Sequence, residues 1–338
     1  MKKFPVLIFT IILIVSALPV AKSSDVQNGS FFDLMVEISE NVKDLPPTQY
    51  RYNAKDNQGT GLDTIKIIQI SERVYLGVYH SFIRGTFQVR LANSTDLLNW
   101  TYVRTIELRA SQPAIALAPN GAYIIAFEKE ENESWSHLTF HYYSNLSTLL
   151  SETASPDAVY DVERSSFNQN INVHEGTPNV YNITLKGPMM HLSVGFHYDN
   201  GVVDNVAIGS LWIPLDNLED INRWVWNETR PLDCYNQKLR DEYLLEGHVG
   251  DRDYGQIFGR NFSLQEAQKV KGNDGTWGIF LYDHSNKTFH KLNITTHKGS
   301  VSIANPTFTW LKSPNGKNCL VVTYFLHTYN ESAKQGEE

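Results

Sequence analysis

The chain has 338 residues, of which 41% are hydrophobic and 20% are charged, and its formal net charge is −8. This composition excludes a disordered chain, a collagen and a protein with many membrane spans, and an acidic chain without a basic stripe is not expected to bind nucleic acid. A chain of this length can bury a large core without a metal or a disulfide, as one large domain or two ordinary ones. The aromatic share of 12% favours sheet over helix.

Residues 1–24 have the layout of a secretory signal peptide. Lys2 and Lys3 precede an apolar run over residues 4–20, and small residues follow. Cleavage near Ser23 or Ser24 predicts a secreted, extracellular protein with no membrane association after signal cleavage. The competing interpretation is an uncleaved N-terminal anchor, because the apolar run is marginal in length for a full span.

Glycosylation triplets of the form Asn-x-Ser/Thr support secretion. One triplet is a weak signal, and several arise by chance in a chain rich in Asn and Ser, but many behind a signal peptide suggest a glycoprotein whose occupied sites lie at the surface. The triplets begin at Asn28, Asn93, Asn99, Asn132, Asn145, Asn182, Asn227, Asn261, Asn286, Asn293 and Asn330.

The chain contains two cysteines, Cys234 and Cys319. In an oxidising compartment they can form a disulfide, and the sequence leaves the bonded and the free forms equally open. They match no redox motif and no zinc pattern.

Strand-sized segments fill most of the chain. Two segments, 31–43 and 264–271, are expected to be short helices. The strands are expected at residues 65–70, 74–79, 86–91, 115–117, 123–127, 138–143, 180–184, 190–198, 204–212, 276–282, 288–292, 307–311 and 320–326.

A polar residue followed by Pro opens three of these strand groups, at Gln112-Pro113, Thr177-Pro178 and Asn305-Pro306. Pro is tolerated at the first position of a strand, where no ladder bond is lost. Adding openings near residues 63 and 251 gives five units, which predicts an all-β, five-bladed β-propeller over residues 61–330. Residues 25–60 form a short helical or irregular segment joining it, and 331–338 form a tail; a large sandwich or jelly roll is the alternative.

The segment Ser94-Thr95-Asp96-Leu97-Leu98-Asn99-Trp100 follows an expected outer strand. Its Ser and Asp side chains can bond the turn backbone while the Trp packs between sheets. This turn resembles that of the five-bladed β-propeller glycoside hydrolases, the arabinanase, levansucrase and invertase superfamily, as a divergent member similar to glycoside hydrolase family 43. The resemblance covers about residues 60–330 at the level of blade pattern.

The resemblance implies three carboxylates that converge at one end of the central tunnel. Asp63 stands at the position of the base or nucleophile, and Glu175, in Glu175-Gly176-Thr177-Pro178, resembles the general acid with one residue inserted. Gln112 stands where the family has a second Asp, so it can bind substrate but carries no charge. Glycoside hydrolysis needs one protonated and one ionised carboxyl, so this departure puts conventional catalysis in doubt.

Other residues are candidates near the expected openings of the fourth and fifth units. Asp251 can supply the missing catalytic carboxylate, and Arg252 and Asp253 are expected to bind substrate; a structural ion-pair network at the centre is the competing interpretation. His297 and Asn305 are further substrate-binding candidates. Trp side chains can form sugar-stacking platforms, although most Trp in a propeller pack between blades: Trp135, Trp212, Trp224, Trp226, Trp277 and Trp310.

The sequence therefore leaves two function classes open. The first is a secreted glycoside hydrolase-like protein that acts on a poly- or oligosaccharide by carboxylate acid/base catalysis. The second is a non-catalytic propeller that binds glycan or protein and has lost a catalytic carboxylate. Either is expected to be a monomer with a carbohydrate partner. No cofactor or metal is expected: an axial calcium or sodium ion is common in the resembling family, but no ligand spacing here supports one.

Overall fold

The computed structural model describes residues 10–16, 28–132, 135–163, 174–199, 202–257, 259–327 and 333–337. Within these residues, four sheets are each built from four consecutive antiparallel strands. The strands are, in sheet 1, β3 (Asp63–Ser71), β4 (Val74–Ile83), β5 (Thr86–Ser94) and β6 (Thr101–Leu108); in sheet 2, β7 (Ala110–Leu117), β8 (Tyr123–Asn132), β9 (Trp135–Tyr143) and β10 (Ala158–Asp161); in sheet 3, β11 (Glu175–Lys186), β12 (Met189–Asp199), β13 (Asp204–Pro214) and β14 (Val225–Pro231); in sheet 4, β15 (Val249–Ile257), β16 (Arg260–Gln268), β17 (Trp277–Asp283) and β18 (Thr288–Lys291).

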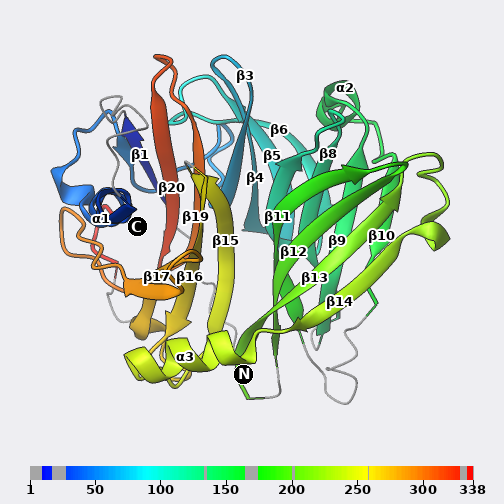
Figure 1. Ribbon diagram of the computed structural model, residues 1–338. Coiled ribbons are helices and arrows are strands. Elements are labelled where there is room, and N and C mark those ends of the chain that lie inside the picture. Colours follow the sequence, from blue (N-terminus) through cyan, green and yellow to red (C-terminus); the bar gives the residue numbers. More distant parts are fainter. Residues whose placement is uncertain are drawn as a thin grey trace.

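A further sheet, the closing sheet, joins the two ends of the chain. Its strand order is β19 (Ile303–Lys312), β20 (Asn318–Leu326), β1 (Thr10–Ser16) and β2 (Tyr50–Arg51). β1 pairs antiparallel with β20 from Thr10–Phe325 to Ser16–Cys319, and the two lie side by side in Figure 1. Part of the segment expected to be a signal peptide is therefore a paired strand of the fold.

The first strands of the sheets form a ring. β3 contacts β7, β7 contacts β11, β11 contacts β15, β15 contacts β19, and β19 contacts β3. Figure 1 shows β3, β11, β15 and β19 gathered about the middle of the molecule. Thr307 and Thr309 of β19 donate their hydroxyl hydrogens to the carbonyls of Ile65 and Ile67 of β3, each at 2.8 Å, so these strands run parallel. The arrangement is an all-β propeller with few helices, and the sandwich alternative is wrong.

Apolar cores lie between neighbouring sheets rather than in one central layer. Phe140 of sheet 2 and Phe196 of sheet 3 belong to one cluster, and Phe262 of sheet 4 and Phe308 of the closing sheet belong to another. Burying each of these side chains contributes about 1.5–3 kcal/mol. The ring is therefore held by face-to-face packing of successive sheets, as a propeller requires.

The polar-Pro openings noticed in the sequence are bulges in the first strands. The residues Thr64, Gln112, Thr177 and Asn305 have φ between 46° and 52°, the left-handed region that non-glycine residues rarely adopt. The register of each first strand shifts at this point, including that of β15 after Asp251. The repeated sequence motif thus encodes a repeated kink near the start of each strand.

The turn at 94–100 forms as the sequence predicted. Ser94 Oγ accepts the N–H of Leu97 at 2.8 Å, and Asp96 Oδ1 accepts the N–H groups of Leu98 and Asn99. Burial opposes the charge of Asp96, but the hydrogen bonds from Asn99 and Leu98 outweigh it and lower the pKa of Asp96. Trp100 is buried against sheet 1 and the closing sheet.

Helices are few and short. The helix expected at 31–43 is confirmed in substance as α1 (Asn28–Glu40), followed by a 3₁₀ turn at Val42–Asp44. The helix expected at 264–271 is wrong, because these residues lie mostly in β16, paired on both sides and buried on both faces. The remaining described helices are α2 (Leu146–Leu150), α3 (Asp233–Tyr243) and 3₁₀ turns at Ile221–Arg223 and Asp274–Thr276.

The disulfide that the sequence left open is not formed. Cys319 is buried in β20 and Cys234 is exposed on α3, and both are free thiols. Burial raises the pKa of Cys319 to about 12, so this thiol is inert at neutral pH.

Candidate functional site

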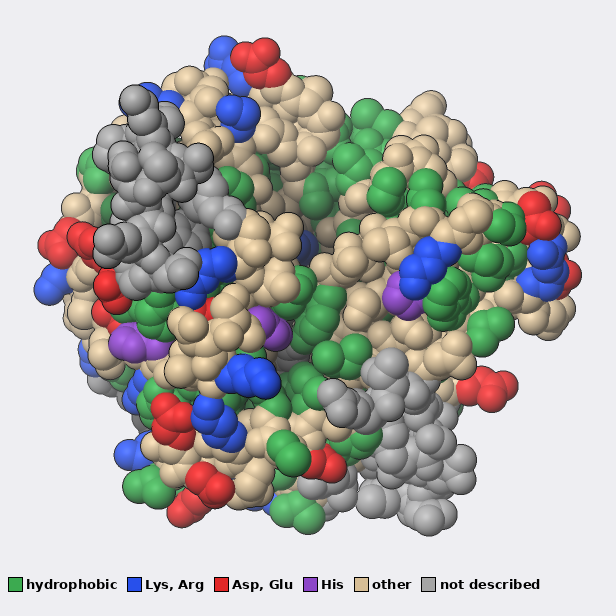
Figure 2. Space-filling view, in the orientation of Figure 1, with side chains coloured by type: hydrophobic (Ala, Val, Ile, Leu, Met, Phe, Trp, Pro, Cys, Tyr) green, Lys and Arg blue, Asp and Glu red, His purple; other side chains and the backbone are tan. Residues whose placement is uncertain are grey.

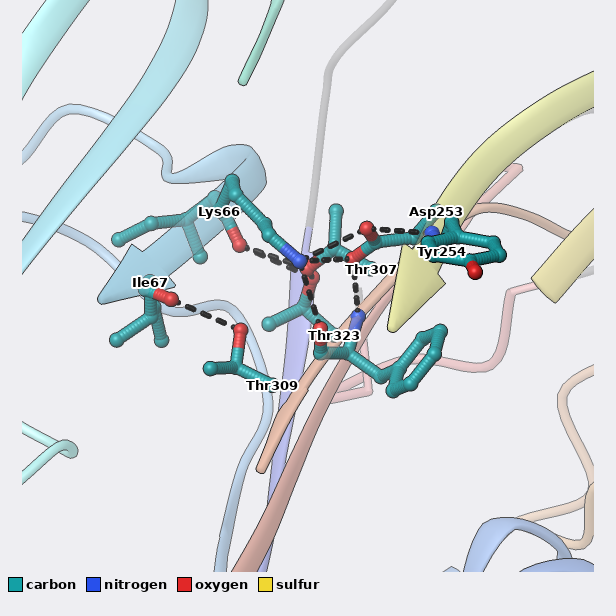
Figure 3. A network of polar contacts seen from close by, with 9 residues as sticks. Lys66, Ile67, Asp253, Tyr254, Thr307, Thr309 and Thr323 are labelled. Atoms are coloured by element: carbon teal, nitrogen blue, oxygen red, sulfur yellow. Dashed lines mark hydrogen bonds and ion pairs between the residues drawn. The ribbon is translucent and has the colours of Figure 1, made fainter. Parts of the chain in front are cut away.

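The centre of the ring is filled by an ion pair. Lys66 of β3 reaches across to Asp253 of β15, with Nζ 2.6 and 2.8 Å from the two carboxylate oxygens, and also donates to the carbonyl of Phe308 (Figure 3). Asp253 further accepts the N–H groups of Phe308 and Tyr254. Burial raises the pKa of Asp253, against the pull of Lys66 and these amides. Asp253, expected to bind substrate, is held in the structural network that was the competing interpretation.

Little space remains beside this ion pair. Figure 2, in the orientation of Figure 1, shows a narrow hollow at the centre of the molecule, between β15 and β11. The axial cavity inside has a volume of about 10 Å³, the room of about one water. Gln112, Thr64 and Thr177 line it together with Asp253 and the opening prolines. No sugar ring fits in the axial cavity.

Asp63 is buried and bound within its own sheet. Its Oδ2 lies 3.1 Å from His80 Nε2, and His80 Nδ1 lies 2.8 Å from Thr64 Oγ1. The backbone N–H of Gln112 donates to the same Nδ1 at 3.2 Å, which assigns the ring proton to Nε2 and lets it bond the carboxylate. Asp63 therefore orients His80, and it lines neither the axial cavity nor the pocket described below.

Glu175 begins β11 and is 1% exposed. Its backbone carbonyl accepts the hydroxyl of Ser136 in sheet 2. The carboxylate of Glu128, also in sheet 2, lies over Gly176, where a Cβ would come within 1.9 Å of Glu128 Oε2. The carboxylate of Glu128 thus lies at the interface of sheets 2 and 3, and Glu175 lines neither the axial cavity nor the pocket below.

The remaining predicted site residues are dispersed. Asp251 and Arg252 lie on β15, but their side chains are outside the described part of the molecule. His297 is exposed beside the closing sheet, where its ring packs on Tyr50 at 4.6 Å and its Nδ1 lies 2.9 Å from the hydroxyl of Tyr52. Asn305, by contrast, lies in a pocket of useful size.

That pocket, here called the rim pocket, lies where the first strands begin and the second strands end. It has a volume of about 240 Å³. Sheet 3, sheet 4 and the closing sheet contribute its lining, which combines carboxylates, imidazoles, an amide and an indole: His197, Asp204, His248, Gly250, Glu266, Trp277, Ala304, Asn305 and His327.

Glu266 is the buried acid of the rim pocket. It belongs to β16 and its carboxylate lies over Gly250, where a Cβ would come within 3.1 Å of Oε1. Its Oε2 accepts the backbone N–H of Asn305 at 2.5 Å. The positive φ of Asn305 accompanies this contact, so the bulge that opens β19 helps to fix the carboxylate in place.

A second carboxylate, Asp204, forms an ion pair with His248, at 2.8 Å between Oδ2 and Nδ1. The hydrogen bond that the imidazole of His248 donates to the carboxylate of Asp204 raises the pKa of His248, although burial opposes the charge. Trp277 stands parallel to the rings of His248 and His327, with centroids 6.3 and 6.0 Å away. The rim pocket therefore has one water-shielded carboxyl, one partly exposed carboxyl paired with an imidazole, and an aromatic wall.

Sequence reasoning missed most of this pocket. Trp277 was among the expected stacking residues, and Asn305 was predicted from its opening motif. Glu266 was hidden because its segment was taken for a helix. Asp204 and His248 lie 44 residues apart and bear no motif.

The glycosylation triplets lie where glycans can be attached, as far as their side chains are described. None of them is buried: Asn93 and Asn261 are half-buried, and Asn99, Asn145, Asn182, Asn227, Asn286 and Asn293 are exposed. The side chains of Asn28 and Asn132, and Asn330 altogether, lie outside the described residues. In the part of the chain that the structure covers, no helix combines the length and apolar character needed to cross a membrane.

Comparison with known proteins gives a mixed result. No family model matches the chain. No curated protein matches it either. Among solved structures, it is similar to an endo-arabinase from Bacteroides thetaiotaomicron, with 11% identity over 82% of this chain and 96% of that chain and a TM-score of 0.46. It is also similar to an α-L-arabinofuranosidase from Lactobacillus brevis, with 12% identity over 76% of this chain and 93% of that chain and a TM-score of 0.40. A third similar structure is an α-L-arabinofuranosidase of Fusarium graminearum in complex with arabinobiose, with 11% identity over 82% of this chain and 81% of that chain and a TM-score of 0.42.

Proposed function

We propose that this protein is a glycosidase-like propeller that binds an oligosaccharide in the rim pocket and cleaves it by carboxylate acid/base catalysis. The observation that carries the proposal is that two carboxylates, Glu266 and Asp204, share one pocket with the indole of Trp277. A pair of carboxylates is the usual equipment for hydrolysing a glycosidic bond. The volume, about 240 Å³, suits about one sugar ring.

The two acids are assigned different roles. Glu266, 3% exposed and held by the amide of Asn305, is assigned as the general acid that protonates the leaving oxygen. Asp204 is open to water and paired with His248, so it is assigned as the ionised partner that activates water or attacks the sugar. Trp277 offers an apolar face for the ring.

The test is hydrolysis of a panel of aryl furanosides and pyranosides by the full chain and by single variants. Glu266→Gln and Asp204→Asn are expected to lower kcat by about 10²–10⁴-fold, because each removes one proton-transfer group. Asp216→Asn is the matched control: Asp216 is exposed and pairs with Arg223 outside the rim pocket, so turnover should be unchanged.

Glu175→Gln separates this proposal from the assignment that the family resemblance implies. Loss of turnover in Glu175→Gln with full turnover in Glu266→Gln would move the reaction to the interface of sheets 2 and 3. Saturable sugar binding without turnover of any substrate would favour the non-catalytic alternative. Either result would contradict the roles assigned above.

The proposal also includes five blades and export from the cell. β19 continues the ring between β15 and β3, which supports counting the closing sheet as the fifth blade whether or not cleavage removes β1. The charged and apolar N-terminal layout and the exposed triplets support secretion as a glycoprotein. N-terminal sequencing and deglycosylation followed by mass measurement test this part, and an unglycosylated chain that begins at Met1 would contradict it.

A further inference from the structure

A second pocket lies at the outer part of sheet 2, where β8 ends, β9 begins and β10 ends. Its volume is about 520 Å³. This outer pocket shares no residue with the rim pocket. Its described lining consists of Glu131, Trp135, His137, Asp161, Val162 and Glu163.

The polar groups of the outer pocket are mostly acceptors. Three carboxylates line it, and its described lining includes no Lys or Arg. Thr139 and His137 both contact Asp161, at 2.6 and 3.4 Å. The hydrogen bond from His137 lowers the pKa of Asp161, with burial opposing and Thr139 assisting, so this acid is ionised at neutral pH.

His137 supplies an independent indication of a ligand. Its side chain is 6% exposed and its Nδ1 is buried without a hydrogen-bond partner. The carboxylate of Glu131 is 3.7 Å away, too far for a hydrogen bond. Nε2 faces Asp161, and the buried Nδ1 has no hydrogen-bond partner among the described residues.

The described residues of the outer pocket are not arranged as a metal site. No group of three or more His, Cys, Asp or Glu in the described residues is arranged to hold a metal ion. The carboxylates instead surround a wide space with the indole of Trp135 at its side, 5.5 Å from the imidazole of His137. Carboxylates around an aromatic face are the surroundings that bind an organic cation.

We propose that the outer pocket binds a protonated primary amine carried on a sugar, that is, an amino-sugar unit of an oligosaccharide. An ammonium has three donors, which can serve His137 Nδ1 and two carboxylates while the sugar ring packs on Trp135. The choice of a sugar as the carrier rests on the proposed function; recognition of the amine does not. Both pockets lie at the end of the sheets where second strands finish, β8 beside the outer pocket and β12 and β16 beside the rim pocket.

The test is calorimetric titration of the full chain at pH 6 with tetraglucosamine and with its N-acetylated counterpart, which has no charge. Tetraglucosamine is expected to bind at least about tenfold more tightly and to weaken as salt is added. Trp135→Ala and Glu131→Gln should each lower this affinity by roughly tenfold. Glu152→Gln, which changes an exposed acid after α2 in the connection between β9 and β10, is the matched control and should bind like the native chain.

Several outcomes would overturn the proposal. They are equal affinity for the two oligosaccharides, affinity unchanged by Trp135→Ala in a protein with native melting behaviour, and preferential binding of tetralysine, which would assign the pocket to a basic peptide. Glu266→Gln keeps the two proposals apart: it should lower kcat by about 10²–10⁴-fold and leave tetraglucosamine binding intact. Turnover at the native rate in Glu266→Gln would contradict the proposed function alone.

Discussion

The ring axis and the rim pocket use the same kinds of side chain in opposite ways. At the axis, the carboxylate of Asp253 is buried, paired with Lys66 and further held by two amides, beside space for about one water. In the rim pocket, Asp204 and His248 form an ion pair that keeps about 30% of each side chain exposed. The axis joins three sheets, whereas the rim pocket leaves acids beside an open space.

The different surroundings of these charged groups follow from which strand of a sheet carries each group. Asp253 lies just past the bulge of β15 and faces the other first strands, where little water remains. Glu266 and His80 lie on second strands and reach the N–H of the bulge residue in the next sheet, Asn305 and Gln112 respectively. Charges at the axis therefore serve stability, whereas Glu266, one strand further out, borders the rim pocket and remains available for chemistry.

Breaking the axial ion pair should give the largest change in stability. Lys66→Ala leaves the buried carboxylate of Asp253 uncompensated, and the free energy of unfolding is expected to fall by about 3–5 kcal/mol. Lys66→Met combined with Asp253→Leu removes both charges and should recover most of the loss. Urea unfolding measures both; a loss below about 1 kcal/mol for Lys66→Ala would show that the axis is not structural.

The second-largest change in stability is expected at low pH, because two buried histidines must take up protons. Burial lowers the pKa of His141 and of His284 from the ordinary 6.5 to about 4. The unfolded chain therefore takes up protons first, so the stability present above pH 6.5 is lost as the pH falls towards 4, by on the order of 2 kcal/mol for each histidine. Melting temperatures of the native chain and of His141→Gln with His284→Gln test this: the variant should show the shallower dependence, and parallel curves would contradict it.

The smallest effect is expected at the rim pocket. Asp204 raises the pKa of His248, so the pair stabilises the fold below pH 6.5 and loses this contribution as the pH rises through the raised value. Asp204→Asn should cost about 1 kcal/mol or less at pH 6 and nothing at pH 9, because both groups are partly exposed. The imidazole resonances should show the pKa of His248 falling in this variant. An unchanged pKa would mean that the pair does not form in solution.

Much of the fold was predictable because the kinked openings and the turn at 94–100 are local. Gln112-Pro113, Thr177-Pro178 and Asn305-Pro306 each lie within three residues of the observed start of a first strand. α3 was missed because it buries little, Asn236 and Leu239 alone among its residues. β1 was missed because an apolar N-terminal run suits a signal peptide as well as a buried strand; cleavage near Ser24 would remove this strand from β20.

The site was harder to predict because a bulge decides which side chain faces the axis. Asp63 precedes the bulge residue Thr64, and its carboxylate turns to His80 in the same sheet. Glu175 lies two residues before the bulge residue Thr177 and is enclosed between sheets. The alternation of side chains along a regular strand does not predict which way the side chains beside a bulge point. The rim pocket also needs three sheets to meet, which no local pattern encodes.

The most direct test of this account is a crystal structure of the Glu266→Gln variant with the oligosaccharide from the substrate panel that it binds most tightly. The account predicts a sugar ring in the rim pocket, against Trp277 and between residue 266 and Asp204, with the Lys66–Asp253 pair undisturbed. A sugar bound on the axis against Gln112 and Thr177, with that ion pair opened, would contradict it.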